Sequence, residues 1–186
     1  MIKQPESNYE IEQFNLEKEN FSFLSKLITG AFLNDSTAQV EGASIAFTEE
    51  TFNTIFGAPS VDRKLFIRAI FKPTNQIVGF LGSIPRDLKI EGKVYKFAIP
   101  AWLSVHSKHQ RKGIAKSMGK KLFEIGKTAG YDGGFSLHEP EQHGIDISKI
   151  VASEEDMPLE RLVTLDKFII RVFDAEKVAS VVNIKW

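Results

Sequence analysis

Apolar residues recur along the first third of the chain at two periods, one typical of strands and one of helices. Residues 9–14 alternate in character and predict a short strand. Asn15 is a candidate cap for the next helix, whose apolar positions at three- to four-residue spacing run from Phe21 to Ala31. A second helix is predicted over residues 49–56, after Thr48.

A run of strands comes next, and turn residues separate its members. The turn at residues 72–75 is predicted from its composition, Pro85 is expected to end a strand, and Glu91-Gly92 is expected to form a hairpin turn. Pro100 predicts a bulge or an edge position in the last strand. The predicted strands cover residues 64–71, 76–84, 87–90, 94–97 and 99–105.

The period then changes to that of a long amphipathic helix. Its apolar positions follow spacings of three and four, and Gly130 is the candidate C-cap. These apolar positions are Ala115, Met118, Leu122, Ile125 and Ala129. Beyond them we expect a strand at 134–138, one or two helices within 141–163, a strand at 165–173, a helix at 174–180 and a last strand at 181–186.

This order of elements predicts an α+β (mixed α/β) fold on a largely antiparallel sheet. The 186 residues suit a single domain over 1–186, with a core at 8–140 and additional elements at 141–186. The chain has no cysteine, which excludes a disulfide framework and a cysteine nucleophile. Neither a signal peptide nor a membrane-spanning apolar run is recognised, so the cytoplasm is the expected location.

Charge is unevenly distributed although the formal net charge is zero. Residues 92–123 contain eight lysines and arginines and no acidic residue, whereas residues 139–160 contain seven carboxylates and only Lys149 to oppose them. A local positive field favours a polyanionic ligand, and nucleic acid, a membrane surface and a phosphorylated cofactor all remain open on charge alone.

The basic window includes the predicted start of the long helix. Helix N-termini carry free N–H groups and a partial positive charge, so Arg111, Lys112 and Lys116 are unfavourably placed there unless an anion binds. Gly113 and the small Ala115 would allow that anion to approach the backbone closely. A solvated basic helix start is the alternative interpretation.

The segment Gln110-Arg111-Lys112-Gly113-Ile114-Ala115 resembles the Q/R-x-x-G-x-G/A motif of the GNAT acyltransferase superfamily. The resemblance implies a GNAT fold with a splay between its fourth and fifth strands, and an acyl-CoA co-substrate without a metal. It further implies that the pyrophosphate lies on Gln110, Arg111, Lys112, Gly113, Ile114, Ala115 and Lys116, and that Leu103 and Val105 of the preceding bulged strand bind the pantetheine arm.

A more specific resemblance is to the N-terminal half of N-myristoyltransferases, carried by residues 78–85 and by Trp102-Leu103-Ser104-Val105-His106. It implies that the backbone N–H groups of Trp102 and Leu103 form an oxyanion hole at the thioester carbonyl. Those enzymes contain two GNAT-like halves, and this chain has room for one. The expected activity is therefore N-acyl transfer, with acetyl-CoA as the favoured donor and a longer acyl group left open.

The candidates for a general base follow the predicted strand at 134–138. The position at which some GNAT enzymes carry a glutamate is Ile99 here, so Glu139 is the first candidate and His138 the second. A solvated polar loop is the alternative. The spacing of His138, Glu139 and His143 does not favour a metal site. His106 and His109 flank the predicted phosphate loop, where they are either CoA contacts or solvated loop residues.

Two functions of other classes remain open from the sequence. A non-catalytic acyl-CoA-binding module would retain the phosphate loop and lack a base. A nucleic-acid-binding protein would use the basic window, although few aromatic residues interleave with its lysines. The acceptor, a small-molecule or peptide amine, is not identified, and a homodimer is left open.

Overall fold

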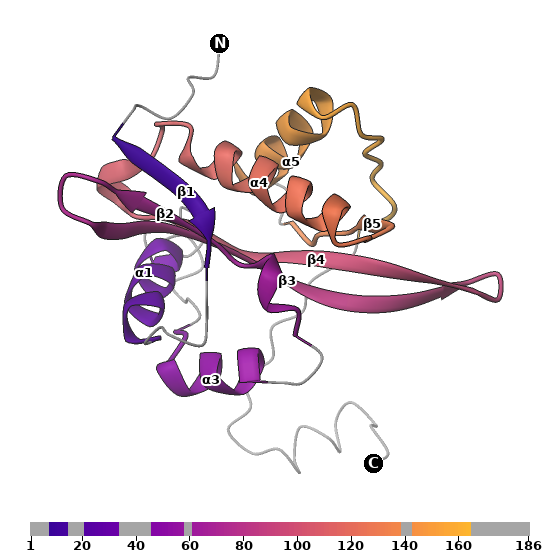
Figure 1. The fold of residues 1–186 in the computed structure, drawn as a ribbon, viewed down its shortest axis with the longest axis horizontal. Helices are drawn as coiled ribbons and strands as arrows, with labels where there is room; N and C mark the ends of the chain where they lie inside the picture. Colours follow the sequence, from indigo (N-terminus) through magenta and orange to yellow (C-terminus); the bar gives the residue numbers. More distant parts are fainter. Residues whose placement is uncertain (1–7, 15–20, 34–45, 58–60, 139–142, 165–186) are drawn as a thin grey trace.

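The computed structural model describes residues 8–14, 21–33, 46–57, 61–138 and 143–164 and contains one five-stranded sheet in the order β1-β2-β3-β4-β5 (Figure 1). Neighbouring strands are antiparallel except for β4 and β5, which are parallel. The strands are β1 (Tyr9–Gln13), β2 (Ile67–Phe71), β3 (Gln76–Ile90), β4 (Lys93–Val105) and β5 (Gly133–Gly134).

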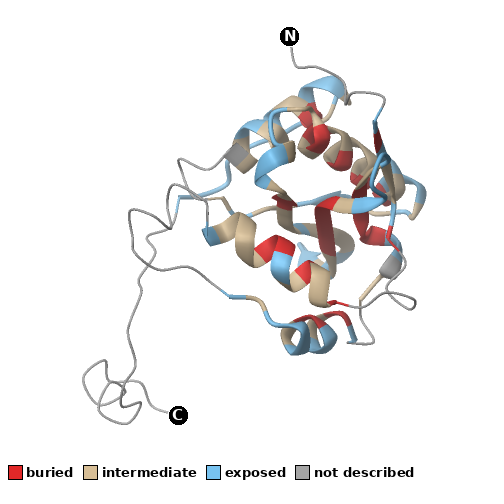
Figure 2. Ribbon diagram, turned by 90° about the vertical axis from the view of Figure 1, so that its left-hand side faces the viewer, coloured by how far each residue is buried: buried red, intermediate tan, exposed pale blue. Residues whose placement is uncertain are grey.

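Helices cover both faces of this sheet (Figure 1). One face packs against an aromatic cluster under α1 and α3, and the other against a largely aliphatic cluster under α4. Figure 2 shows the buried residues, in red, on the strands and on the helices that pack against them. No helix among the described residues has the length and apolar character needed to cross a membrane. The helices are α1 (Ser22–Leu33), α3 (Glu49–Gly57), α4 (Ile114–Thr128) and α5 (His143–Glu154).

The N-terminal elements lie close to their predicted positions. Thr48 caps α3, because its Oγ1 accepts a hydrogen bond from the backbone N–H of Thr51 at 3.1 Å. The strand predicted from residue 64 begins later, because Asp62 caps a 3₁₀ turn, η2 (Arg63–Leu65), by accepting from the backbone N–H of Lys64. Asn15, the candidate cap of α1, lies outside the described residues.

The prediction that Pro85 ends its strand is wrong. β3 continues through Pro85 to Ile90, and the hairpin strands predicted at 87–90 and 94–97 are the outer parts of β3 and β4. Pro85 lies beyond Leu81, the last β3 residue that pairs with β2. A proline on a strand edge that faces no partner costs no ladder hydrogen bond.

The hairpin turn at Glu91-Gly92 is confirmed. Both residues have positive φ, 50° and 85°, as a two-residue turn of type I′ requires, and Ile90 pairs with Lys93 across it. The outer parts of β3 and β4 form an arm that extends beyond the helices on both faces (Figure 1).

The strand predicted at 134–138 is much shorter in the structure. β5 consists of Gly133 and Gly134 alone, paired with Phe97 and Ala98. The N–H of Phe135 still donates to the carbonyl oxygen of Ala98, at 3.2 Å, and after this bond the two chains diverge. In the described part of the chain, β4 beyond Ala98 has no strand on that edge, which is the expected splay.

The long predicted helix is confirmed as α4, which begins one residue earlier, at Ile114. Gly130 follows its end with a φ of 74°, the left-handed conformation expected of a C-terminal glycine. The uncertain region 141–163 contains one described helix, α5, which packs against α4 where Gly119 faces Val151. The elements predicted for residues 165–186 lie outside the described residues.

Candidate functional site

A β-bulge interrupts β4 at Trp102 and Leu103, two residues beyond the predicted position at Pro100. Both residues stand opposite Leu81, and the register gives neither of them a partner on β3. Trp102 has a φ of 58°, a conformation rare for a bulky side chain. The bulge lies between two regular pairs, Gly82 with Ala101 and Phe80 with Ser104.

The aromatic cluster under α3 holds the Trp102 side chain in place. Its ring packs edge-on against Phe56, with centroids 5.2 Å apart, and against Phe52 at 6.3 Å. Gly82 leaves room for the indole, because a Cβ there would lie 3.1 Å from Trp102 Cε3. Packing on this face therefore supports the strained backbone of the bulge.

The edge of β4 that faces the splay carries backbone groups of Leu103 and Val105. His106 donates its N–H to the carbonyl of Val78 on β3, at 2.8 Å, so by alternation Val105 and Leu103 face the opposite edge. The side-chain amide of Gln110 donates to the carbonyl oxygen of Val105, at 3.2 Å. This bond ties the start of the predicted phosphate loop to the open edge of β4.

The predicted phosphate loop leads into the N-terminus of α4 in a left-handed conformation. Arg111 has a φ of 60° and Gly113 a φ of 79°, and Gly113 is the N-cap of α4 without a side-chain hydrogen bond to the first turn. The N–H groups of Ile114, Ala115 and Lys116 belong to this first turn, which has no intrahelical acceptors. An uncapped helix start preceded by left-handed residues is a suitable cradle for an anion.

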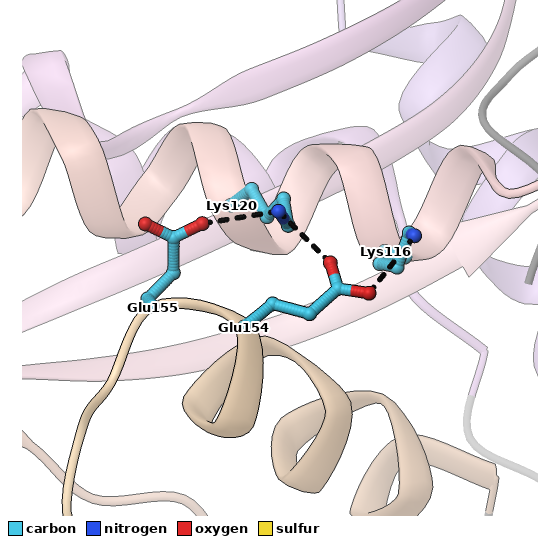
Figure 3. Close-up of polar contacts among 4 residues, drawn as sticks. All are labelled: Lys116, Lys120, Glu154 and Glu155. Carbon is cyan, nitrogen blue, oxygen red and sulfur yellow. Dashed lines mark hydrogen bonds and ion pairs between the residues drawn. The ribbon is translucent and has the colours of Figure 1, made fainter.

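The basic side chains of the loop take different directions. Arg111 is exposed, and the Lys112 ammonium lies 5.8 Å from the centroid of the Tyr9 ring. Lys116 is 6% exposed and points to α5, where its Nζ lies 3.3 Å from Oε1 of Glu154 (Figure 3). The charge of Lys116, expected beside the anion, is therefore balanced by a carboxylate of the protein itself.

Two residues near the loop were not singled out from the sequence. Tyr9 on β1 contacts His109 directly before the loop, with 2.9 Å between the hydroxyl oxygen and Nδ1. Glu154 neutralises Lys116 from the end of α5. Tyr9 carried no signal beyond the alternation of its strand, and Glu154 was one of many carboxylates in the acidic segment.

His138 lies on the segment that follows β5 and is held by hydroxyl groups. Its Nε2 is 2.7 Å from Oγ of Ser136 and 3.3 Å from Oγ of Ser148 on α5. Burial lowers the pKa of His138, so the imidazole is neutral at pH 7 and has the protonation state of a base. Glu139, the first candidate for the base, lies outside the described residues.

The described residues contain no group of three or more histidine and acidic side chains that could hold a metal ion. His106, which flanks the predicted phosphate loop, caps η3 (Ser107–His109), because its Nδ1 accepts a hydrogen bond from the N–H of Lys108 at 3.3 Å. The site thus consists of backbone donors on two neighbouring segments, the bulge and the start of α4.

Solved acetyltransferase structures share this fold across most of the chain. The aminoglycoside acetyltransferase meta-AAC0020 from an uncultured soil metagenomic sample, in complex with sisomicin, superposes with a TM-score of 0.57 at 20% identity, over 88% of this chain and 97% of that one. Glucosamine-6-phosphate N-acetyltransferase from Arabidopsis thaliana gives a TM-score of 0.54 at 12% identity, over 89% and 99%.

An N-myristoyltransferase is similar over a smaller part of its own length. The Saccharomyces cerevisiae enzyme with bound myristoyl-CoA superposes with a TM-score of 0.57 at 21% identity, over 70% of this chain and 31% of that one. This chain therefore spans about a third of that enzyme. No curated protein sequence matches the chain significantly.

The sequence profile of the family described as "Acetyltransferase (GNAT) domain" matches residues 16–135, which is well over half of the chain. This match includes α1, α3, the bulge and the whole of α4, so it covers both segments that carry the backbone donors. The chain belongs to the GNAT acetyltransferase family.

Proposed function

We propose that this protein transfers an acyl group, most simply acetyl, from coenzyme A to a primary amine by direct attack. The observation that carries the proposal is the continuity of one open edge of β4, with the Trp102–Leu103 bulge near one end and the uncapped start of α4 beyond the other. An extended pantetheine arm along this edge would join a diphosphate on α4 to a thioester at the bulge.

In the proposed reaction the diphosphate binds the N–H groups of the loop between Gln110 and Lys116. The N–H groups of Trp102 and Leu103 donate to the thioester oxygen, which becomes negatively charged when the amine nitrogen attacks the carbonyl carbon. The amine proton passes to a base, the carbon–sulfur bond breaks, and CoA leaves as a thiolate that takes up a proton. Donors fixed by backbone packing need no rearrangement as that charge develops.

Glu139 and His138 are the proposed bases for the amine proton. His138 is supported by its neutral imidazole and by hydroxyl groups that fix its ring. A short acyl group is supported by the two acetyltransferases that match this chain along nearly their whole length. Cytoplasmic location and an amine of small-molecule or peptide origin are part of the same proposal.

Isothermal titration with CoA, acetyl-CoA and myristoyl-CoA tests the donor site. Wild type should bind acetyl-CoA, and Ala115→Asp should abolish binding, because a carboxylate in the first turn of α4 would repel and displace the diphosphate. Thr128→Asp, which adds the same charge at the exposed opposite end of α4, should bind normally.

Turnover is measured separately, as thiol release from acetyl-CoA with a panel of primary amines. Binding without turnover on any amine would favour the non-catalytic acyl-CoA-binding module, for which the apolar Ile99 is the supporting feature. Failure to bind any of the three CoA compounds would overturn the proposal. RNA binding with a steep salt dependence would then indicate the nucleic-acid alternative.

A further inference from the structure

A contact between distant parts of the sequence anchors the segment before the phosphate loop. The Tyr9 hydroxyl lies 2.9 Å from Nδ1 of His109, across 100 residues of sequence. Tyr9 is only 6% exposed, and both rings pack on Phe71 of β2, with centroid distances of 5.4 Å from Tyr9 and 4.9 Å from His109. Two strands of the sheet thus fix the position of one imidazole.

This imidazole is placed to control the loop. His109 is the last residue of η3 and directly precedes Gln110, while Lys112, on the far side of Arg111, reaches back over the Tyr9 ring. The left-handed conformation at Arg111 is unfavourable for a residue with a Cβ, so the loop needs support from outside itself. Tyr9 supplies that support at both ends of the left-handed turn.

Among the described residues, the charges that act on His109 come from basic side chains. His106 lies across η3 with its ring centroid 5.7 Å away, Lys108 precedes His109, and Lys112 faces the same ring of Tyr9. Burial, and then the charges of His106, Lys112 and Lys108, lower the pKa of His109. Within the described part of the chain, the Tyr9 side chain and the Phe71 ring also pack against it.

A bound polyanion would reverse this electrostatic environment. The diphosphate of the proposed CoA site would lie on the residues immediately after His109, and a negative charge there favours the imidazolium form. We propose that Tyr9 and His109 form a clamp that positions the CoA phosphate loop, and that His109 takes up one proton from solvent when the diphosphate binds. This inference rests on the proposed function.

The proton balance of the clamp is simple. In the free protein the imidazole is neutral, and one hydrogen lies between the Tyr9 hydroxyl oxygen and Nδ1 of His109. On binding, a solvent proton occupies whichever imidazole nitrogen carries none, so that both ring nitrogens are donors and Nδ1–H donates to the Tyr9 hydroxyl oxygen. Linkage then requires that affinity rise as pH falls through the range in which His109 titrates.

The test is isothermal titration of the full chain with dephospho-CoA, which lacks the phosphate monoester that itself titrates near pH 6. Each titration is repeated in two buffers of different ionisation enthalpy, at about pH 6 and pH 8. Wild type should take up protons at the lower pH and almost none at the higher, with tighter binding at the lower pH.

Two conservative variants separate the two parts of the clamp. His109→Asn keeps an amide near the position of Nδ1 but cannot titrate, so it should bind at pH 8 nearly as wild type does and take up no proton at pH 6. Tyr9→Phe retains the ring and loses the hydrogen bond, which should weaken binding about two- to tenfold. Tyr95→Phe on the hairpin arm is the matched control and should bind as wild type does.

Each outcome decides between the two proposals. If wild type binds dephospho-CoA without proton uptake, or if His109→Asn still takes up a proton, the clamp is overturned and the acyltransferase proposal stands. If wild type binds neither CoA nor dephospho-CoA, the proposed function fails first. Unchanged binding by Tyr9→Phe would remove the positioning role.

Discussion

Nζ of Lys116 lies 3.3 Å from Oε1 of Glu154, and this contact joins the first turn of α4 to the last residue of α5. Glu154 also accepts from Lys120 at 2.8 Å, and Lys120 reaches Glu155 at 3.1 Å (Figure 3). Carboxylates at the C-terminal end of α5 are unfavourable for that helix alone, and the two lysines of α4 offset the cost. The ion pairs thus hold α5 against the helix that begins at the predicted phosphate loop.

Glu154→Gln should lower the midpoint of thermal unfolding. The change leaves the buried Lys116 ammonium without its counter-ion, and an uncompensated buried charge destabilises a fold more than the loss of an exposed pair. Differential scanning fluorimetry gives the midpoint. Glu124→Gln, which breaks the exposed pair with Lys121, is the control and should have almost no effect. Equal effects of the two changes would contradict the role of Glu154.

The same pair should contribute to stability in a defined pH range. Hydrogen bonds from Lys120 and then Lys116 lower the pKa of Glu154 from its ordinary value of 4.5. A lowered carboxyl pKa stabilises the folded state above the unfolded pKa, and that contribution is lost as pH falls through the folded pKa. Wild type and Glu154→Gln should therefore differ in urea unfolding at pH 7 and converge as pH falls through the lowered pKa of Glu154.

Gly134→Ala should destabilise the fold, while Gly126→Ala should stabilise it. A Cβ at Gly134 would lie 2.7 Å from the carbonyl oxygen of Ala98, so β5 would have to move from β4, at about 1–3 kcal/mol. A Cβ at Gly126 meets no atom within 4 Å, and alanine in the interior of α4 should add about 0.5–1 kcal/mol. Chemical denaturation of both variants measures the difference.

Gly134→Ala should also affect catalysis more than Gly126→Ala, because the β4–β5 pair closes the end of the splay. The readout is the KM for acetyl-CoA after a check that the variant is folded at the assay temperature. A Gly134→Ala protein with wild-type stability and KM would show that the junction tolerates a side chain.

Ser104→Ala should leave stability unchanged or raise it by up to about 1 kcal/mol. The Ser104 side chain is 2% exposed, and its hydroxyl has no hydrogen-bond partner among the described residues, so its removal loses no bond. Ser25→Ala is the contrasting control, because Ser25 Oγ donates to the carbonyl of Phe47. That variant should lose about 1 kcal/mol in the same denaturation experiment.

The half-buried His138 should make the protein sensitive to mild acid. Because burial lowers the pKa of His138, the unfolded chain binds a proton more readily in mild acid. The stability of the fold is therefore independent of this group above about pH 6.5 and declines as pH falls below it. His138→Asn should flatten this part of the stability profile. If His138 is also the base, the variant should lose the rise of kcat over the same range.

Features that depend on neighbouring residues could be predicted from the amino-acid pattern alone. The spacing of apolar residues defined α4 to within one residue, because a long amphipathic helix carries its period in every turn. Glu91-Gly92 specified its hairpin for a similar reason, since the turn depends on two neighbouring residues. The phosphate-loop motif was recognisable because its residues are contiguous and lead directly into that helix.

Features that depend on partners distant in the chain could not be predicted in this way. Pro85 ends a strand by local rules, and it continues one here because β2 no longer pairs at that position. The bulge falls at Trp102 because the register with β3 and the space above Gly82 place it there. Likewise, the sequence shows Lys116 and His109 only as basic residues of the loop region. Folding places Glu154 beside Lys116 and Tyr9 beside His109. A charge or a strand edge acquires its role from neighbours that only folding provides.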